Sequence, residues 1–126
     1  MANQTEGLVV GDGLKAELPN DASRATETIV SGAGNLPLFR VLGRITASGK
    51  LTNYTPGAVD GSEVAYAVLV GATDASAADA KGPVIDWTAT FAYNRLTWGA
   101  AVTTLAHKNT ALAQLRNRGI RTLNLA

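Results

Sequence analysis

Cysteine is absent from this chain of 126 residues. The sequence therefore excludes disulfide bonds, zinc sites built on thiolates and iron–sulfur clusters. A chain of this length buries roughly two-thirds of the surface that its unfolded form exposes. Its stability must come from packing or from assembly with other chains, and cysteine usage gives no sign of an oxidising compartment.

The sequence also lacks a basic N-terminal region and a long apolar run. Its first residues, MANQTEGLVVGDGLKAEL, do not have the features of a cleaved signal peptide. No stretch approaches the ~20 apolar residues that a membrane span requires. We expect a soluble protein that is made and used without export through a cleaved signal and that has no membrane partner.

Net charge is small, at +1, so the composition predicts no overall attraction to nucleic acid. Its distribution is uneven, because residues 1–35 carry five acidic and two basic side chains whereas residues 36–126 carry five acidic and nine basic ones. Two solvated surfaces are the simplest interpretation. The basic side chains near the C-terminus lack the exposed aromatic neighbours that stack on bases, so we expect no nucleic-acid partner.

Groups that carry catalysis are scarce. His107 is the only histidine, and because a nucleophile needs a paired base, we interpret His107 as a surface or interface residue. Asp74, Asp79 and Asp86 surround one loop without the ligand alternation of a calcium site. Lys50 lacks the sequence frame of a lipoyl or biotinyl carrier. The sequence therefore predicts no enzyme activity, no cofactor and no metal site.

The first 25 residues differ in composition from the remainder and predict an extended N-terminal arm. They contain scattered charges, three glycines and only short apolar pieces. The apolar triplet Leu8–Val10 is the exception. It is suited either to pairing with the sheet edge of a partner or to packing back on its own domain.

Residues 26–126 predict a single β-rich domain. Strands are expected over 26–30, 38–45 and 50–54. Gly43 indicates a bulge or a close backbone approach within the second of them, and Pro56–Gly57 predict a turn. In LFRVLGRI, alternation predicts one face with Phe39, Val41 and Ile45 and the opposite face with Arg40, Leu42 and Arg44. We interpret SGAGN (31–35) as a turn.

Two further stretches give the strongest strand signals. EVAYAVLV (63–70) is apolar on both faces, with Val64 on the same face as Tyr66, and predicts a central strand. PVIDWTATFAY (83–93) alternates, which predicts that Ile85, Trp87, Phe91 and Tyr93 face inward together. The small residues of GATDASAADAKG (71–82) predict a loop. Trp98 follows the last of these strands and suits either a core position or an interface.

The C-terminal part predicts the one helix, over about 104–118. Leu105, Leu112 and Leu115 recur at helical spacing, Thr103 or Thr104 can cap the start, and Gly119 can end it. IRTLNLA is a candidate for a final short strand. The fold class expected from the residues is therefore mainly β with one C-terminal helix (α+β).

Several short motifs occur in an order that resembles the head decoration, or capsid-stabilising, proteins of tailed bacteriophages, the lambda D-protein family. SGAG precedes the first core strand, ITASGKL and DGSEVA are followed by AVLV, and TDASAAD fills the next loop. A strand then ends in LTW and a helix closes with RGI. The resemblance covers about residues 26–121.

The resemblance implies a compact β-barrel-like or β-clip body and a structural role. Members sit as homotrimers on the outer surface of the expanded head, at local threefold sites, and clamp the shell against the pressure of the DNA inside. The implied partners are the major capsid protein and the chain itself, and the implied location is the outside of the virion, after synthesis in the host cytoplasm. N-terminal segments of the family add strands to the capsid protein. The residues that this assigns here to capsid binding are Leu8, Val9, Val10, Leu14, Thr28, Ile29 and Val30. Candidates for other interfaces are Trp98, Arg40 and Arg44.

A second interpretation is a small β-sandwich recognition module, for example one that binds carbohydrate. It requires an exposed aromatic platform and a stable monomer. Of the seven aromatic residues, Phe39, Trp87, Phe91 and Tyr93 are expected to face inward, which leaves few for a platform.

Overall fold

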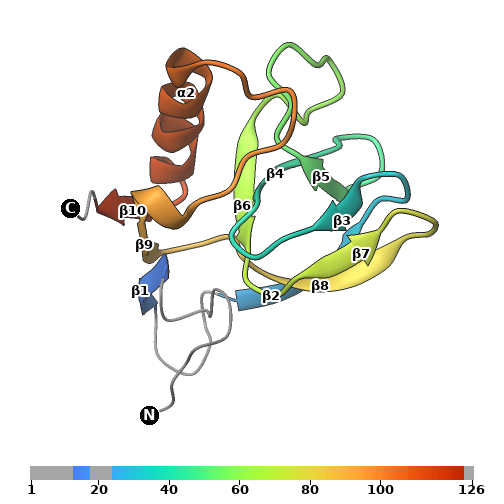
Figure 1. The fold of residues 1–126 in the computed structure, drawn as a ribbon, viewed down its shortest axis with the longest axis horizontal. Coiled ribbons are helices and arrows are strands. Elements are labelled where there is room, and N and C mark those ends of the chain that lie inside the picture. Colours follow the sequence, from blue (N-terminus) through green and yellow to red (C-terminus); the bar gives the residue numbers. More distant parts are fainter. Residues whose placement is uncertain (1–12, 18–23, 124–126) are drawn as a thin grey trace.

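The computed structural model describes residues 13–17 and 24–123 of the chain (Figure 1). It is mainly β, with the helix α2 near the C-terminus and a closed barrel of five strands, which confirms the fold class expected from the sequence. The elements, in chain order, are β1 (Leu14–Glu17), β2 (Arg24–Ile29), β3 (Gly34–Leu36), β4 (Val41–Arg44), β5 (Leu51–Asn53), β6 (Ala65–Leu69), β7 (Thr73–Ala75), β8 (Ala80–Ile85), β9 (Ala89–Ala92), the 3-10 turn η2 (Tyr93–Arg95), α2 (Leu105–Arg116) and β10 (Ile120–Leu123).

The barrel closes in the order β2-β5-β4-β6-β8. Its neighbours are antiparallel except for β2 and β5, which meet in parallel where Ile29 pairs with Leu51. A second sheet, in the order β1-β9-β10, lies beside the barrel, and β10 runs parallel to β9. Helix α2 stands over β6 and β10 (Figure 1).

Strand β6 separates two hydrophobic clusters. Ala67 and Leu69 belong to the cluster inside the barrel, whereas Ala65 and Val68 belong to the cluster that α2 and the β1-β9-β10 sheet cover. All four of these side chains are buried. The expectation of a central strand with apolar packing on both faces is confirmed, because β6 is flanked by β4 and β8 and buried on both sides.

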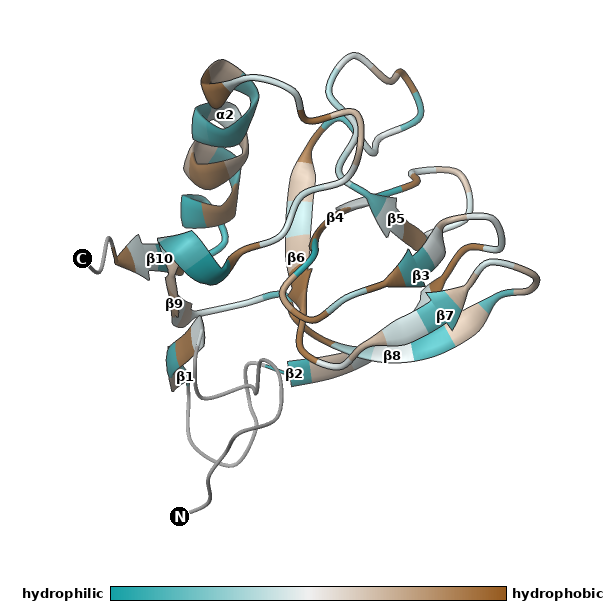
Figure 2. Cartoon of the chain, viewed as in Figure 1, coloured by the Kyte–Doolittle hydropathy of each residue, from teal (hydrophilic) through white to brown (hydrophobic). Residues whose placement is uncertain are grey.

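The predicted turns and helix ends are also confirmed. Gly57 has a φ of 87° and the amide of Ala58 donates to the carbonyl of Thr55, as a type II turn requires. Thr104 caps α2, since its side chain accepts from the amide of His107. Gly119 has a φ of 83° just beyond the helix. In Figure 2, hydrophilic and hydrophobic segments alternate along the ribbon of α2.

Gly43 is a point of close backbone approach. The register between β4 and β6 shifts between Leu42 and Gly43, which is the expected bulge. A Cβ atom added at Gly43 would lie 2.5 Å from the carbonyl oxygen of Ser62 and 2.7 Å from its Cα. The loop before β6 therefore passes directly over β4, and only glycine leaves room for it.

The prediction of one long strand over 83–93 is wrong. The structure divides it into β8 and β9, and Trp87, in the connection, has 53% of its surface exposed instead of facing inward. Tyr93 is half-buried and lies in η2, not in a strand. The cause is a contact distant in sequence, because residues after α2 hold the connection in place, as described below.

Smaller differences have similar causes. The expected turn at 31–35 and loop at 71–82 contain β3 and β7, which pair with each other, and β8 begins at Ala80. Leu42 lies inside the barrel, whereas Val41 belongs to the cluster under α2, so these two residues face opposite ways as expected. Val64 is 48% exposed, because a turn from Gly61 places it ahead of β6.

Leu105 is 65% exposed, because it begins α2 at the rim of a hollow and not over the core, whereas Leu115 is buried as expected. Phe39, expected within a strand, has a φ of 66° and packs edge to face on Phe91. The expected last strand is confirmed as β10. No helix of the described residues is long and apolar enough to cross a membrane.

Candidate functional site

The first strand fixes the predicted N-terminal arm to the body. β1 pairs with β9 from Leu14↔Phe91 to Glu17↔Ala89, and Leu14 packs against the cluster under α2. A Cβ atom on Gly13 would fall 2.5 Å from the ring of Phe39, so the chain enters β1 in close contact with that ring. Within the range predicted as the arm, residues 14–17 and 24–25 are thus strands of the folded body.

The two ends of the 18–23 connection are held together by an ion pair. Nε and Nη2 of Arg24 donate to the two carboxylate oxygens of Glu17, at 2.9 and 3.0 Å. This two-pronged contact is only partly exposed and holds the pKa of Glu17 below its ordinary value. β1 and the start of β2 are therefore linked by side chains as well as by the main chain.

The residues assigned to capsid binding lie in three settings. Leu8, Val9 and Val10 lie outside the described residues. Leu14 is half-buried in β1. Thr28 and Ile29 are in β2, opposite Lys81 and Ala80 of β8, with Ile29 fully buried in the barrel and Val30 directly after it. The structure does not bring Leu14 together with Thr28–Val30, and a role for these residues in capsid contact stays a prediction.

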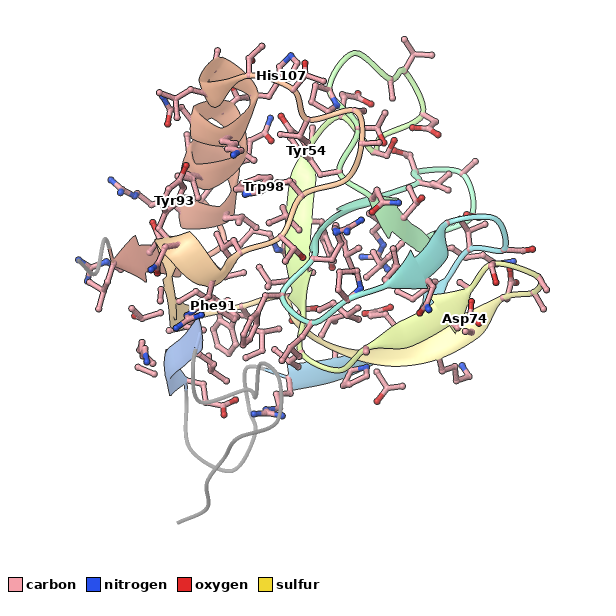
Figure 3. All side chains as sticks on the ribbon, in the orientation of Figure 1. Tyr54, Asp74, Phe91, Tyr93, Trp98 and His107 are labelled. Carbon is pink, nitrogen blue, oxygen red and sulfur yellow. The ribbon has the colours of Figure 1, made fainter. Side chains whose placement is uncertain are left out.

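Two of the three other interface candidates lie close together. The Nη1 of Arg40 donates to Oδ1 of Asn53 at 2.7 Å, and its Nε donates to Oγ1 of Thr97, next to Trp98, at 3.4 Å. Burial lowers the pKa of the Arg40 guanidinium. Trp98 is half-buried against the cluster under α2, with Nζ of Lys108 5.8 Å from its ring centre. Figure 3 shows Trp98 on the side of the molecule that carries α2, and Asp74 at the opposite end.

The third candidate, Arg44, lies in a separate stack of cations on an aromatic ring. Its Nη1 donates to the hydroxyl of Tyr66 at 2.7 Å and its Nε to the carbonyl of Gly49 at 3.1 Å. The guanidinium carbons of Arg44 and Arg118 lie 4.8 and 3.9 Å from the centre of the Tyr66 ring. These contacts are within the range of cation–π attraction.

A hollow of about 380 Å³ opens beside this stack. Arg44 and Tyr66 form one part of its wall, and the rest comes from Thr46, Gly61, Glu63 and Val64. Among the residues that the structure describes, no carboxylate forms an ion pair with either arginine of the stack, since the ion pairs found there join Arg24 to Glu17 and Lys50 to Asp79. Oε1 of Glu63 accepts a hydrogen bond from the amide of Gly61 at 2.9 Å.

Sequence reasoning missed the exposed position of Trp87, next to this stack. Nε of Arg118 donates to the carbonyl of Asp86 at 2.8 Å, and the carbonyl of Arg118 accepts from the amide of Thr88 at 3.3 Å. Arg118 thus holds the residues on both sides of Trp87. The polar residues on either side of this tryptophan, Asp86 and Thr88, were the available signal, although alternation alone predicts an inward indole.

Three of the groups considered for catalysis, His107, Asp79 and Lys50, form hydrogen bonds within the fold. Nδ1 of His107 accepts from the amide of Thr103 at 3.3 Å, in the first turn of α2. Asp79 accepts from Nζ of Lys50 at 2.6 Å and from the amide of Ser31 at 2.8 Å, and these bonds lower its pKa. The described ranges contain no group of three or more His, Asp or Glu side chains arranged to hold a metal ion.

Comparison with known proteins supplies the family. A search of curated proteins found no match. The family model of bacteriophage lambda head decoration protein D matches residues 3–120, which is nearly the whole chain and includes the barrel, α2 and the residues ahead of β1. Because the match is this extensive, the chain belongs to the lambda head decoration protein D family, structural proteins of the virion that are bound to the outside of the phage capsid.

Proposed function

We propose that this chain decorates the head of a tailed phage as a homotrimer, at local threefold sites, and stabilises the expanded shell. The observation that carries the proposal is the family match over residues 3–120. The major capsid protein is the proposed partner, and the N-terminal residues are the proposed tether to it. Within this proposal the chain acts by binding alone, without catalysis and without nucleic acid.

The attachment of β1 supports a tether that starts from a fixed point. Residues 1–12 precede a strand that is paired with β9, packed through Leu14 and locked to β2 by the Glu17–Arg24 contact. A pull on those residues is resisted by the hydrogen bonds of the β1-β9 pair before it reaches the barrel. We therefore narrow the proposed tether from residues 1–25 to residues 1–12, with Leu8–Val10 as the part that adds a strand to the capsid protein.

Weak contacts are sufficient for this role when three copies act together. A backbone hydrogen bond contributes about 1 kcal/mol net, so one short added strand gives only modest affinity. Linking binding sites in one molecule raises overall affinity by about 10²–10⁴-fold without new contacts. A trimer with three tethers then dissociates slowly, and slow dissociation is all that a cement protein requires.

The test uses purified protein and expanded shells of the phage that encodes it. We expect light scattering after size-exclusion chromatography to give a trimer, and co-sedimentation with shells to show saturable binding that raises the shell's melting temperature. A variant lacking residues 2–12 should keep its trimer and lose most shell binding. A full-length protein that does not bind shells would refute the proposed function, whereas undiminished binding of the truncated protein would refute only the tether.

The carbohydrate-binding alternative gains one observation, because Trp87 is exposed and not inward. A single indole is a smaller platform than sugar rings usually require, and the family match favours decoration. A glycan array probed with the same protein tests this alternative directly. Binding by a monomer would support it.

A further inference from the structure

The exposed indole of Trp87 and the stack beside it form one surface, which we name the Trp87 surface: Arg44, Val64, Tyr66, Trp87 and Arg118. It combines a half-exposed tryptophan, a half-exposed valine and two arginines stacked on a tyrosine ring. Tryptophan, tyrosine and arginine are the residue types that contribute most to binding energy at protein interfaces. Arg44, Val64 and Tyr66 line the hollow of about 380 Å³, and Arg118, stacked on Tyr66, connects them to the residues on both sides of Trp87.

The Trp87 surface is held rigid from inside the molecule. Arg118 fixes the backbone on both sides of Trp87, through the carbonyl of Asp86 and the amide of Thr88. The amide of Ala89 then donates to the carbonyl of Gly119 at 3.2 Å, so the connection is fastened along its length. A side chain that is already ordered loses less conformational entropy on binding, which favours affinity.

The charge of the surface indicates the chemistry of its partner. Arg44 and Arg118 are positively charged, and in the described part of the chain neither has a carboxylate partner. Stacking on Tyr66 holds both guanidinium groups in defined positions, and each has N–H donors beyond those used in the contacts described above. Carboxylates match guanidinium donors best, often through two parallel hydrogen bonds.

The position of the surface favours the capsid protein over a second copy of this chain. Glu17, at the end of β1, pairs with Ala89, so the connection that carries Trp87 adjoins the strand from which the proposed tether leaves. A second hollow, of about 190 Å³, joins the two, since its wall includes residues of β1 together with Thr88 and Gly119. The proposed tether precedes Leu14, at the other end of this four-residue strand, so a partner that holds the tether is one short strand away from the Trp87 surface.

We propose that the Trp87 surface docks an acidic segment of the major capsid protein, with a carboxylate bound by Arg44 and Arg118 and an apolar side chain packed on Trp87. This inference rests on the proposed function and adds a second contact to the tether. The tether supplies the effective concentration, and the Trp87 surface sets the orientation of the body on the shell.

The experiment compares two variants with two matched controls, in full-length protein bound to expanded shells. Trp87→Ala removes an exposed indole, and Arg118→Glu reverses one charge of the stack. Leu105→Ala removes another exposed apolar side chain, and Arg95→Glu makes the same charge change in η2. Thermal unfolding and the trimer state are measured for all four, because Arg118 also contributes to the fold.

We expect shell affinity to fall by about tenfold or more for Trp87→Ala and Arg118→Glu, as for other central interface residues, and to stay within about twofold of the parent for the controls. The loss from Arg118→Glu should shrink at high salt, where charge contacts are screened. If the parent binds and Trp87→Ala binds equally well, the inference is overturned while the proposed function stands. Loss of the trimer by Trp87→Ala overturns it too, because the surface then joins copies of this chain. A parent that does not bind shells refutes the proposed function.

Discussion

Replacing Gly43 by alanine tests the close crossing of the 54–64 loop over β4. The added Cβ would lie 2.5 Å from the carbonyl oxygen of Ser62, about 1 Å closer than ordinary contact, and the atoms it meets are backbone atoms that cannot rotate away. Overpacking of this kind costs about 1–3 kcal/mol. Because the contact is with backbone, we expect the upper part of that range, about 3 kcal/mol. The melting temperature should then fall by about 10 °C for a domain of this size.

Gly57→Ala is the matched control for this variant. Gly57 has a φ of 87°, but nothing lies within 4 Å of an added Cβ atom, so its cost is conformational alone. The left-handed conformation costs about 1–2 kcal/mol, and the reduced freedom of the unfolded chain offsets about 0.4–1 kcal/mol of it. Urea denaturation of both variants at one protein concentration gives the two free energies of unfolding. If Gly43→Ala is no less stable than Gly57→Ala, the crossing is looser than the structure has it and the argument fails.

Two further predictions concern the core and the response to acid. Leu115→Ala removes a fully buried side chain under α2 and should lower the free energy of unfolding by about 2–5 kcal/mol; a loss below about 1 kcal/mol by urea denaturation would contradict the packing of α2. The pKa of Asp79 is lowered by its bonds to Lys50 and Ser31. The folded form therefore binds fewer protons than the unfolded form. The stability that results is present above the ordinary aspartate pKa of about 4 and is lost as the pH falls below that value. Asp79→Asn should flatten this part of the curve of melting temperature against pH, and an unchanged acid limb would show that the contact does not act on stability.

Much of the fold could be predicted from the sequence where the signal is local. Glycine at positive φ, a threonine cap and an apolar strand depend on residues that are neighbours in the chain, and Gly57, Thr104 and β6 are as expected. The helix expected over about 104–118 agrees with α2 to within two residues at each end. Such features follow from backbone sterics and periodicity, which a single sequence contains.

The errors arise where a distant residue decides the outcome. Alternation placed Trp87 inside because nothing near it in sequence shows that Arg118 holds the backbone on either side. The small pairing of β3 with β7 was missed for the same reason, since neither segment has a strand pattern of its own. The sequence therefore does not predict that Trp87 is exposed beside Arg44, although it does indicate Arg44 as an interface candidate.

Strand β6 contributes to both hydrophobic clusters, and this affects how the molecule unfolds. Because residues of β6 pack into both hydrophobic clusters, loss of packing in one cluster also removes support from a strand that the other cluster needs. Detachment of α2 would expose Ala65 and Val68 on one side of β6, and the barrel would lose the packing that supports this strand. The barrel and the helix-covered sheet are therefore expected to unfold together, in one cooperative transition.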